Sequence, residues 1–294
     1  MKTNEHLTQQ ATGGFAPAVA PVASTTRHTD DQGLHTSETT IPTQGENMPA
    51  YLARPATASG PLPVVLVVQD PFTSYYDAQV VADFVRLAEK IGYQPVVLPF
   101  SPNGKAQHIK GFLTRFAKTA QKTSDFLNRV AQLDMPMVGV DPALVLCYRD
   151  EYKQTLGDKR GDFQVLLVHE WLPSVLKQTA PQEVSGESWY LFGHCTEVTA
   201  LPTAPAQWAS IFARYGAKLE SVNVGCCGMA GTYGHEVKNH ANSLGIYELS
   251  WHQAMQRLPR NRCLATGYSC RSQVKRVEGN GVRHPLQALL EIIG

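Results

Sequence analysis

Apolar residues in the first part of the chain form short runs separated by turn residues. Residues 39–69 predict two short strands around the turn at residues 45–48, GENM, and then an apolar strand, Pro63 to Gln69. Val64 to Val68 is continuously apolar, so we expect it to be buried on both faces of a sheet. The pattern indicates a sheet near the start of the fold.

The apolar residues that follow this strand have the spacing of a helix. Residues 77–91 carry apolar side chains on one helical face, Gly92 ends the pattern, and Pro95 to Leu98 predicts another strand. A strand, a helix and a second strand in this order are typical of a parallel sheet.

A longer helical pattern covers Lys105 to Gln132, with core residues expected at Phe112, Phe116, Ala120 and Phe126. The sequence MVGVD, residues 137–141, predicts a further strand. The apolar ALVLCYR that follows places Cys147 in a strand-like context, where a buried cysteine is expected.

The same order then recurs. Residues 189–228 again predict a strand, a helix ended by Gly216, and a strand. Matched positions lie about 125 residues apart, and they pair Asp70 with Cys195, Gly92 with Gly216, Pro99 with Cys226, and Ala143 with Cys270. We therefore predict an α/β fold of two strand–helix repeats related by pseudo-symmetry, with extra N-terminal strands beside the first repeat.

Four segments follow from this reading. Residues 1–38 are rich in Thr, Gln, Ala, Gly and Pro without a sustained period, so we expect a disordered leader. Residues 39–69 form the N-terminal strands, residues 70–188 the first repeat and a connector, and residues 189–294 the second repeat.

Charge and hydropathy narrow the class of protein. The 26 Lys and Arg residues nearly balance the 25 Asp and Glu residues, so nucleic acid and anionic membranes are not expected partners. The first 24 residues lack a continuous apolar core typical of a signal peptide, and no run of 18 apolar residues predicts a membrane span. We expect a cytoplasmic protein.

The cysteines carry the candidate chemistry. Five of the six lie after residue 194, and in a reducing compartment such clustering indicates metal binding or redox work. Cys195, Cys226, Cys227 and Cys270 follow predicted strands, whose ends meet at one edge of an α/β sheet. Four thiolates are the number that an iron–sulfur cluster requires.

Glycines on both sides of Cys226 and Cys227 would let the backbone aim two adjacent sulfurs inward, which a regular strand cannot do. In the first repeat, Asp70, Pro99, Phe100 and Ala143 replace the four cysteines, so only the second repeat can hold a soft metal.

Other roles for these residues stay open. Each cysteine can be a small buried hydrophobe, the reading preferred for Cys147 and Cys263, although Cys263 is also available as a substitute ligand. Structural zinc is disfavoured because Cys-x-x-Cys pairs are absent. His194 and His235 flank the cysteine motifs and are expected to be core residues or outer partners of the ligands, with direct ligation as the alternative.

Three motifs, CTEV, GCCGMAGTYGHE and TGYSCR, resemble the cysteine-rich CCG domain of heterodisulfide reductases and related iron–sulfur proteins. Residues 70–294 resemble the C-terminal end of large bacterial FAD-linked oxidases similar to D-2-hydroxyglutarate dehydrogenase. The resemblance implies a 4Fe–4S type cluster on Cys195, Cys226, Cys227 and Cys270.

In that family a flavin domain oxidises a 2-hydroxy acid, and electrons leave through iron–sulfur centres. The sequence shows neither a flavin-binding domain nor the C-x₂-C-x₂-C-x₃-C-P run of ferredoxins. The resemblance therefore implies an iron–sulfur electron-transfer module that is not catalytic alone. FAD would be carried on a partner flavoprotein domain or subunit.

Residues 39–69 are similar to the opening strands of dienelactone hydrolases, on the elements GENMPAY and GPLPVVLVVQ. That activity needs a nucleophile elbow, and neither G-x-C-x-G nor G-x-S-x-G occurs in the sequence. The two resemblances meet near VVQDPF, which favours a chain fused at a shared strand over one ancestral gene that drifted at its start. The alternative function is a hydrolase-like fusion or remnant without activity of its own.

Overall fold

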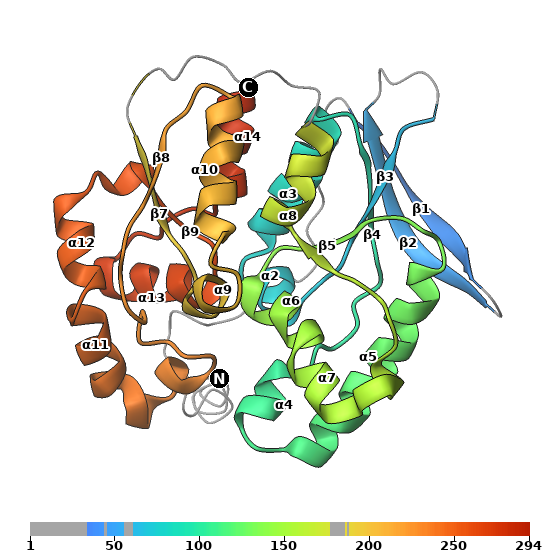
Figure 1. The fold of residues 1–294 in the computed structure, drawn as a ribbon, viewed down its shortest axis with the longest axis horizontal. Helices are drawn as coiled ribbons and strands as arrows, with labels where there is room; N and C mark the ends of the chain where they lie inside the picture. Colours follow the sequence, from blue (N-terminus) through green and yellow to red (C-terminus); the bar gives the residue numbers. More distant parts are fainter. Residues whose placement is uncertain (1–33, 44–45, 56–60, 177–185, 187) are drawn as a thin grey trace, which may run out of the picture.

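The described part of the chain forms two β-sheets, with helices packed between them and on their outer faces (Figure 1). The computed structural model describes residues 34–43, 46–55, 61–176, 186 and 188–294. Its mixture of strands and helices confirms the predicted α/β class.

The first sheet has six strands in the order β1-β2-β4-β3-β5-β6. They are β1 (Leu34–Thr43), β2 (Glu46–Pro55), β3 (Val64–Val67), β4 (Gln94–Val97), β5 (Met137–Gly139) and β6 (Leu166–Leu167). The strands β3 to β6 run parallel, whereas β1 and β2 form an antiparallel hairpin that joins the sheet along β4.

The second sheet has three parallel strands, β7 (Trp189–Phe192), β8 (Leu219–Ser221) and β9 (Cys263–Ala265). Their order is β8-β7-β9, with the first strand of the set in the middle. In the first sheet the order β4-β3-β5 likewise places the strand that comes first in the chain between the two that follow it.

Helices lie between the two sheets and bury a shared apolar core (Figure 1). These are α3 (Ala78–Lys90), α8 (Val168–Val175), α10 (Ala204–Arg214) and α14 (Pro285–Ile293). Val65 and Val67 of β3 face this layer, while the alternate residues Leu66 and Val68 face the opposite core. The expectation that β3 is buried on both faces is confirmed, because successive strand side chains point to opposite sides.

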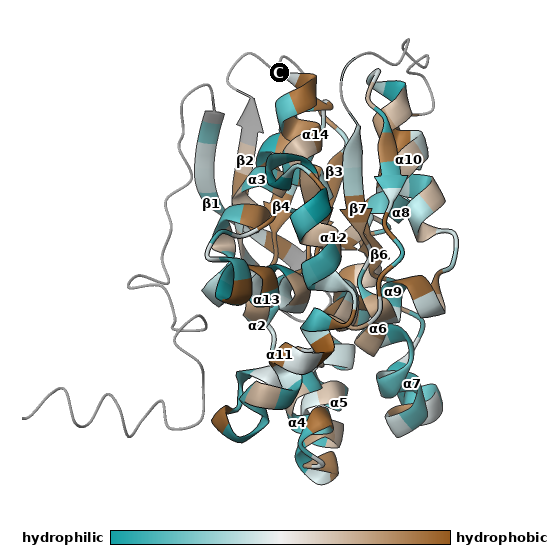
Figure 2. Cartoon of the chain, turned by 90° about the vertical axis from the view of Figure 1, so that its left-hand side faces the viewer, coloured by the Kyte–Doolittle hydropathy of each residue, from teal (hydrophilic) through white to brown (hydrophobic). Residues whose placement is uncertain are grey.

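The other helices cover the outer faces of the two sheets. On the first sheet they include α5 (Leu113–Ala131), α6 (Pro142–Arg149) and α7 (Glu151–Leu156), and on the second α11 (His240–Glu248), α12 (Trp251–Arg257) and α13 (Tyr268–Glu278). The short helix α4 (Lys105–Ile109) precedes α5 and has no buried residue. The short helices α2 (Pro71–Tyr76) and α9 (Cys195–Ala200) follow β3 and β7. Figure 2 shows hydrophobic residues concentrated on the inner strands and hydrophilic ones on α7 and α12. No helix in the described ranges is both long and apolar enough to cross a membrane.

The predicted helix from Lys105 to Gln132 is wrong in one respect, because the chain forms two helices there. Gly111 adopts a left-handed φ of 75° and ends α4, and α5 begins after Phe112. Phe116 and Ala120 are in the core as expected, but Phe112 at the break is 54% exposed.

The strand context assigned to Cys147 is also wrong, since the residue lies in α6. Asp141 caps this helix by accepting the N–H groups of Ala143 and Leu144, and Pro142 occupies the first turn. The Asp–Pro pair at the end of β5 therefore starts a helix. The burial expected for Cys147 is confirmed at 0% exposure.

The two expected N-terminal strands are present as β1 and β2. Residues 1–33 of the predicted leader lie outside the described residues, and residues 34–38 belong to β1. The hairpin begins earlier than the sequence pattern indicated.

Candidate metal centre

The carboxyl ends of strands from both sheets meet around a cavity of about 260 Å³. Its lining residues follow β3, β5, β7, β8 and β9, or come from the helices beside them: Phe72, Lys105, Ile109, Asp141, Ala143, His194, Cys195, Thr196, Cys226, Cys227, Ala230, Gly231, Tyr268 and Ser269. A crevice at the carboxyl ends of parallel strands is the usual ligand site of an α/β sheet.

The four cysteines expected at this edge lie in series. Cys195 opens α9 and its thiol interacts with that of Cys226, which in turn interacts with Cys227. Cys227 is buried and interacts with Cys270, in the first turn of α13. Cys195, Cys226 and Cys227 line the cavity, whereas Cys270 is not among its lining residues but interacts electrostatically with Cys195 as well as with Cys227.

Cys226 accepts hydrogen bonds from the thiols on both sides of it. Hydrogen bonds from the thiols of Cys195 and Cys227 hold its pKa well below the usual range, and the Gly228 N–H donates to its Sγ at 3.3 Å. The same contacts raise the pKa of Cys195 and, together with burial, that of Cys227. Hydrogen bonding among the thiols therefore shifts the pKa of Cys226 in the direction opposite to the pKa shifts of Cys195 and Cys227.

The glycines around the cysteine pair have different roles. Gly228 has a φ of 87°, and a Cβ there would lie 2.1 Å from the Ser243 carbonyl oxygen. Gly231 has a φ of 66°, and a Cβ would lie 2.4 Å from Ile109. The left-handed backbone expected beside the pair is thus found after it, whereas Gly225 before it is not left-handed.

Asp141 joins the two halves of the molecule at this cavity. Its Oδ1 caps α6, and its Oδ2 accepts the N–H of Tyr268, the first residue of α13, at 2.7 Å. The Tyr268 ring stacks on Phe72 with centroids 5.3 Å apart. The cavity is consequently built from both sheets.

A buried acidic group lies next to Cys195. Glu197 is 1% exposed and accepts a hydrogen bond from Thr266, whose hydroxyl also accepts the His194 N–H at 2.9 Å. The His169 Nδ1 lies 3.3 Å from the other Glu197 oxygen. Burial raises the pKa of Glu197 to about 7.

The two histidines singled out from the sequence are both buried. His194 lines the cavity, and its ring packs so closely on Gly267 that a Cβ there would lie 2.3 Å from the ring. His235 is 3% exposed, and burial lowers its pKa to about 4. The His235 ring centroid is 6.5 Å from that of Tyr268, and His235 is not among the lining residues.

Cys263, the predicted substitute ligand, starts β9 and lies in an apolar core. Its thiol donates to the Pro259 carbonyl at 3.4 Å, and burial raises its pKa to about 11. It does not line the cavity.

The arrangement does not match a site for one metal ion. In the parts of the chain that the structure describes, no three His, Cys, Asp or Glu side chains form a group suited to a single ion. The four thiols nevertheless lie beside the cavity, and thiolates are soft ligands that can bind zinc, copper or iron–sulfur clusters.

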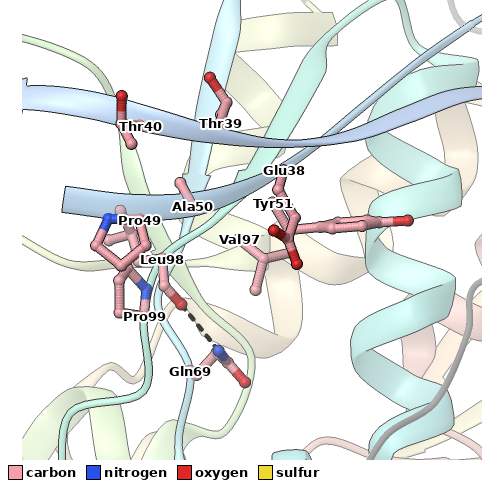
Figure 3. Close-up of a pocket in the computed structure, with 10 residues that line it drawn as sticks. All are labelled: Glu38, Thr39, Thr40, Pro49, Ala50, Tyr51, Gln69, Val97, Leu98 and Pro99. Atoms are coloured by element: carbon pink, nitrogen blue, oxygen red, sulfur yellow. Dashed lines mark hydrogen bonds between the residues drawn. The ribbon is translucent and has the colours of Figure 1, made fainter. Parts of the chain in front are cut away.

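A larger hollow of about 750 Å³ lies beside the β1–β2 hairpin (Figure 3). Glu38, Pro49, Tyr51 and Gln69 are among its lining residues, and the Gln69 amide donates to the Leu98 carbonyl at 2.8 Å. No cysteine or histidine lines it, so the thiol cavity remains the candidate site.

Sequence reasoning missed the residues that complete the cavity, namely Phe72, Lys105, Asp141 and Tyr268. Asp141 could have been found, because Asp–Pro after a strand predicts a helix cap at a strand's carboxyl end. Tyr268 and Phe72 carry no such signal, since their contact depends on how the two sheets face each other.

The chain is similar to two different groups of known proteins, each over a different part of its length. One match is 84% identical over 229 residues to a D-2-hydroxyglutarate dehydrogenase of Escherichia coli K12. Most of the chain resembles D-2-hydroxyglutarate dehydrogenase. A relative of that name from Haemophilus influenzae is 56% identical over 238 residues. The chain spans about a fifth of the length of these relatives, 22% and 23% respectively.

A shorter part of the chain is similar to carboxymethylenebutenolidases. A predicted carboxymethylenebutenolidase of Escherichia coli K12 is 57% identical over 65 residues, which are 22% of this chain and 23% of that protein. This match is longer than residues 39–69. Both resemblances seen in the sequence are confirmed.

Two further comparisons add little. No family model matches the chain. The crystal structure of a predicted dienelactone hydrolase from Klebsiella pneumoniae covers 76% of this chain and 97% of its own, with 17% identity and a TM-score of 0.31, too low to support an argument.

Proposed function

We propose that the chain is the iron–sulfur electron-transfer part of a D-2-hydroxyglutarate dehydrogenase-type enzyme, and that its flavin is carried elsewhere. The observation that carries the proposal is the series of four thiols at a cavity between the two sheets. The names of the relatives supply the substrate class. Cys195, Cys226, Cys227 and Cys270 would hold a cluster of the 4Fe–4S type.

The cavity suits such a group in its chemistry. Thiolates are the usual ligands of iron–sulfur clusters, and a backbone N–H donated to a ligand sulfur is among the contacts that set their potential. When bound, the cluster supplies one-electron chemistry. The chain's own residues hold the sulfurs, and the stacked rings of Phe72 and Tyr268 shield one side of the cavity from water.

The proposal also includes the two strand–helix repeats predicted from the sequence. The strand orders β4-β3-β5 and β8-β7-β9 support two copies of one unit related by pseudo-symmetry. In the first copy Asp70 caps α2 where Cys195 opens α9, and Ala143 lies in α6 where Cys270 lies in α13. The first copy would then contribute cavity wall rather than ligands.

Oxidation of a 2-hydroxy acid requires a hydride acceptor beside the substrate carbon, and a flavin supplies that chemistry. We therefore expect the purified chain to leave D-2-hydroxyglutarate unchanged when a dye is the acceptor and no flavoprotein is present. Turnover under these conditions would contradict the proposal.

The direct test is anaerobic purification followed by iron and sulfide analysis. We expect a brown protein with about four irons and four acid-labile sulfides per chain. Cys227→Ser should lose the colour and the iron, whereas the matched variant Cys263→Ala, which removes a thiol outside the cavity, should keep both. A colourless wild-type chain would overturn the proposal.

The hydrolase resemblance provides the alternative, an inert hydrolase-like fusion or remnant. The sequence holds no nucleophile elbow, so we expect no hydrolysis of a dienelactone or a simple ester. Activity on either substrate would favour the alternative.

A further inference from the structure

The loop that carries Cys226 and Cys227 is fastened to α13 by three polar side chains, Ser243, Gln273 and Arg276, which we call the clasp. The Gln273 amide donates to the Ser243 carbonyl at 3.2 Å and to its hydroxyl at 3.1 Å. Arg276 donates to the Ser243 hydroxyl at 2.8 Å and also to Gln273. The three residues therefore form one connected network.

This network contacts the loop on both sides of its turn. Gly228 packs on the Ser243 carbonyl so closely that no Cβ fits between them. Arg276 donates to the Gly234 carbonyl at the far end of the turn, and the Gly234 N–H closes the turn by donating to Met229 at 2.8 Å. The backbone that follows the cysteine pair is thus held at two points.

The same helix also carries the fourth thiol. Cys270, Gln273 and Arg276 lie three residues apart on α13, a spacing that places them on neighbouring positions of one helical face. Ser243 and Gln273 are both 0% exposed, so their hydrogen bonds are not shared with solvent. Three of the four thiols are consequently joined in one rigid unit.

Arg276 brings a positive charge to this unit. Burial lowers the pKa of its guanidinium and the nearby Cys227 thiol acts in the opposite direction, so the two groups are close enough for their charges to interact. The side chain also lies within the electrostatic reach of His235.

We propose that Arg276 is a positioning residue for the candidate metal centre: it fixes the Cys226–Cys227 loop against α13. This role concerns the protein alone and holds with or without iron, and only its consequence for a cluster rests on the proposed function.

Arg276→Gln removes the charge, and Arg276→Lys keeps the charge but loses the forked geometry. Ser243→Ala removes a clasp hydroxyl and leaves Arg276 in place. Arg260→Gln is the matched control, because the Arg260 guanidinium directs its hydrogen bonds and its ion pair to Glu278 at the end of α13.

In the iron-free chain, the measurement is the rate of thiol alkylation on the peptide that carries Cys226 and Cys227, followed by mass spectrometry. We expect up to about tenfold faster labelling in Arg276→Gln and Ser243→Ala than in wild type, because losing a hydrogen bond of the clasp raises the population of the open loop by up to about that factor. Arg260→Gln should label at the wild-type rate. Equal rates in all variants would overturn the positioning role, and Ser243→Ala decides it if Arg276→Gln does not fold.

Iron uptake separates this role from the proposed function. A wild-type chain that takes up no iron would overturn the proposed function, and the alkylation rates would still decide whether Arg276 holds the loop.

Discussion

Gly228 shows how strongly one position can restrict the choice of residue. It combines a left-handed φ of 87° with a contact that leaves no space for a Cβ beside the Ser243 carbonyl. Gly245, only a few residues beyond Ser243, lies in α11 with open space around its Cα. The two glycines therefore allow a matched comparison.

We expect Gly228→Ala to lower the free energy of unfolding by about 2 kcal/mol or more, because a left-handed alanine and a backbone clash act together. Gly245→Ala should raise it by up to about 1 kcal/mol, since alanine favours a helix. Urea unfolding of both variants checks this. Equal effects would show that the loop relaxes around the added methyl group.

Asp70 provides a test by pH. It is 4% exposed, and burial, followed by the nearby charge of Asp141, raises its pKa from 3.8 to about 7. Between about pH 4 and 7 the folded state keeps a proton that the unfolded state has lost. This group's contribution to stability is therefore complete at low pH and is lost as pH rises towards 7.

Across that range, the wild-type free energy of unfolding should fall relative to Asp70→Asn by up to about 1.4 kcal/mol per pH unit. Asparagine keeps an oxygen that can accept the N–H groups of Phe72 and Thr73, which cap α2 in wild type. Urea unfolding at several pH values gives the difference. Parallel curves for the two proteins would mean that Asp70 titrates normally.

At the scale of the element, strands were easier to predict than helix ends. Every residue of β3 is apolar, because a strand that is buried on both faces of a sheet needs an apolar side chain at every position. Such a run is easy to recognise in the sequence. The break between α4 and α5 depends on Gly111, which the helical spacing of its neighbours concealed. Helix α6 begins at the capping pair Asp141 and Pro142. The apolar residues that follow this pair resemble a strand, so the sequence pattern predicted a strand there instead.

The candidate site was predictable to the extent that it follows strand ends. The expected convergence of Cys195, Cys226 and Cys227 required only the rule for parallel sheets. The clasp could not be predicted, because Gln273 and Arg276 look like ordinary polar residues of a surface helix. Their role depends on α13 packing against the loop before it in the chain.

For the whole molecule, the layer between the sheets determines how the chain unfolds. Side chains of Val65, Phe84 and Trp171 share one apolar core with Trp189 of β7 and Leu286 of α14. Separating the sheets would expose this core to water. We infer that neither sheet keeps its structure without the other.

Urea unfolding should accordingly show one transition. All four tryptophans are buried: Trp171 lies in α8, in the segment that forms the first sheet and its helices, whereas Trp189, Trp208 and Trp251 lie in the segment that begins with β7. Tryptophan fluorescence and far-ultraviolet circular dichroism should therefore change at the same urea concentration. Two separated midpoints would contradict a shared core.

The β1–β2 hairpin meets the rest of the fold along β4, where Tyr51 pairs with Val97 and Leu52 with Val96. Ladder bonds of this kind join peptide groups and place few demands on side-chain identity. The hairpin can therefore join the sheet through backbone pairing alone. In this chain β1 and β2 lie in the part that resembles dienelactone hydrolases, whereas β4 lies in the part that resembles D-2-hydroxyglutarate dehydrogenase, so pairing at one strand edge joins the two resemblances.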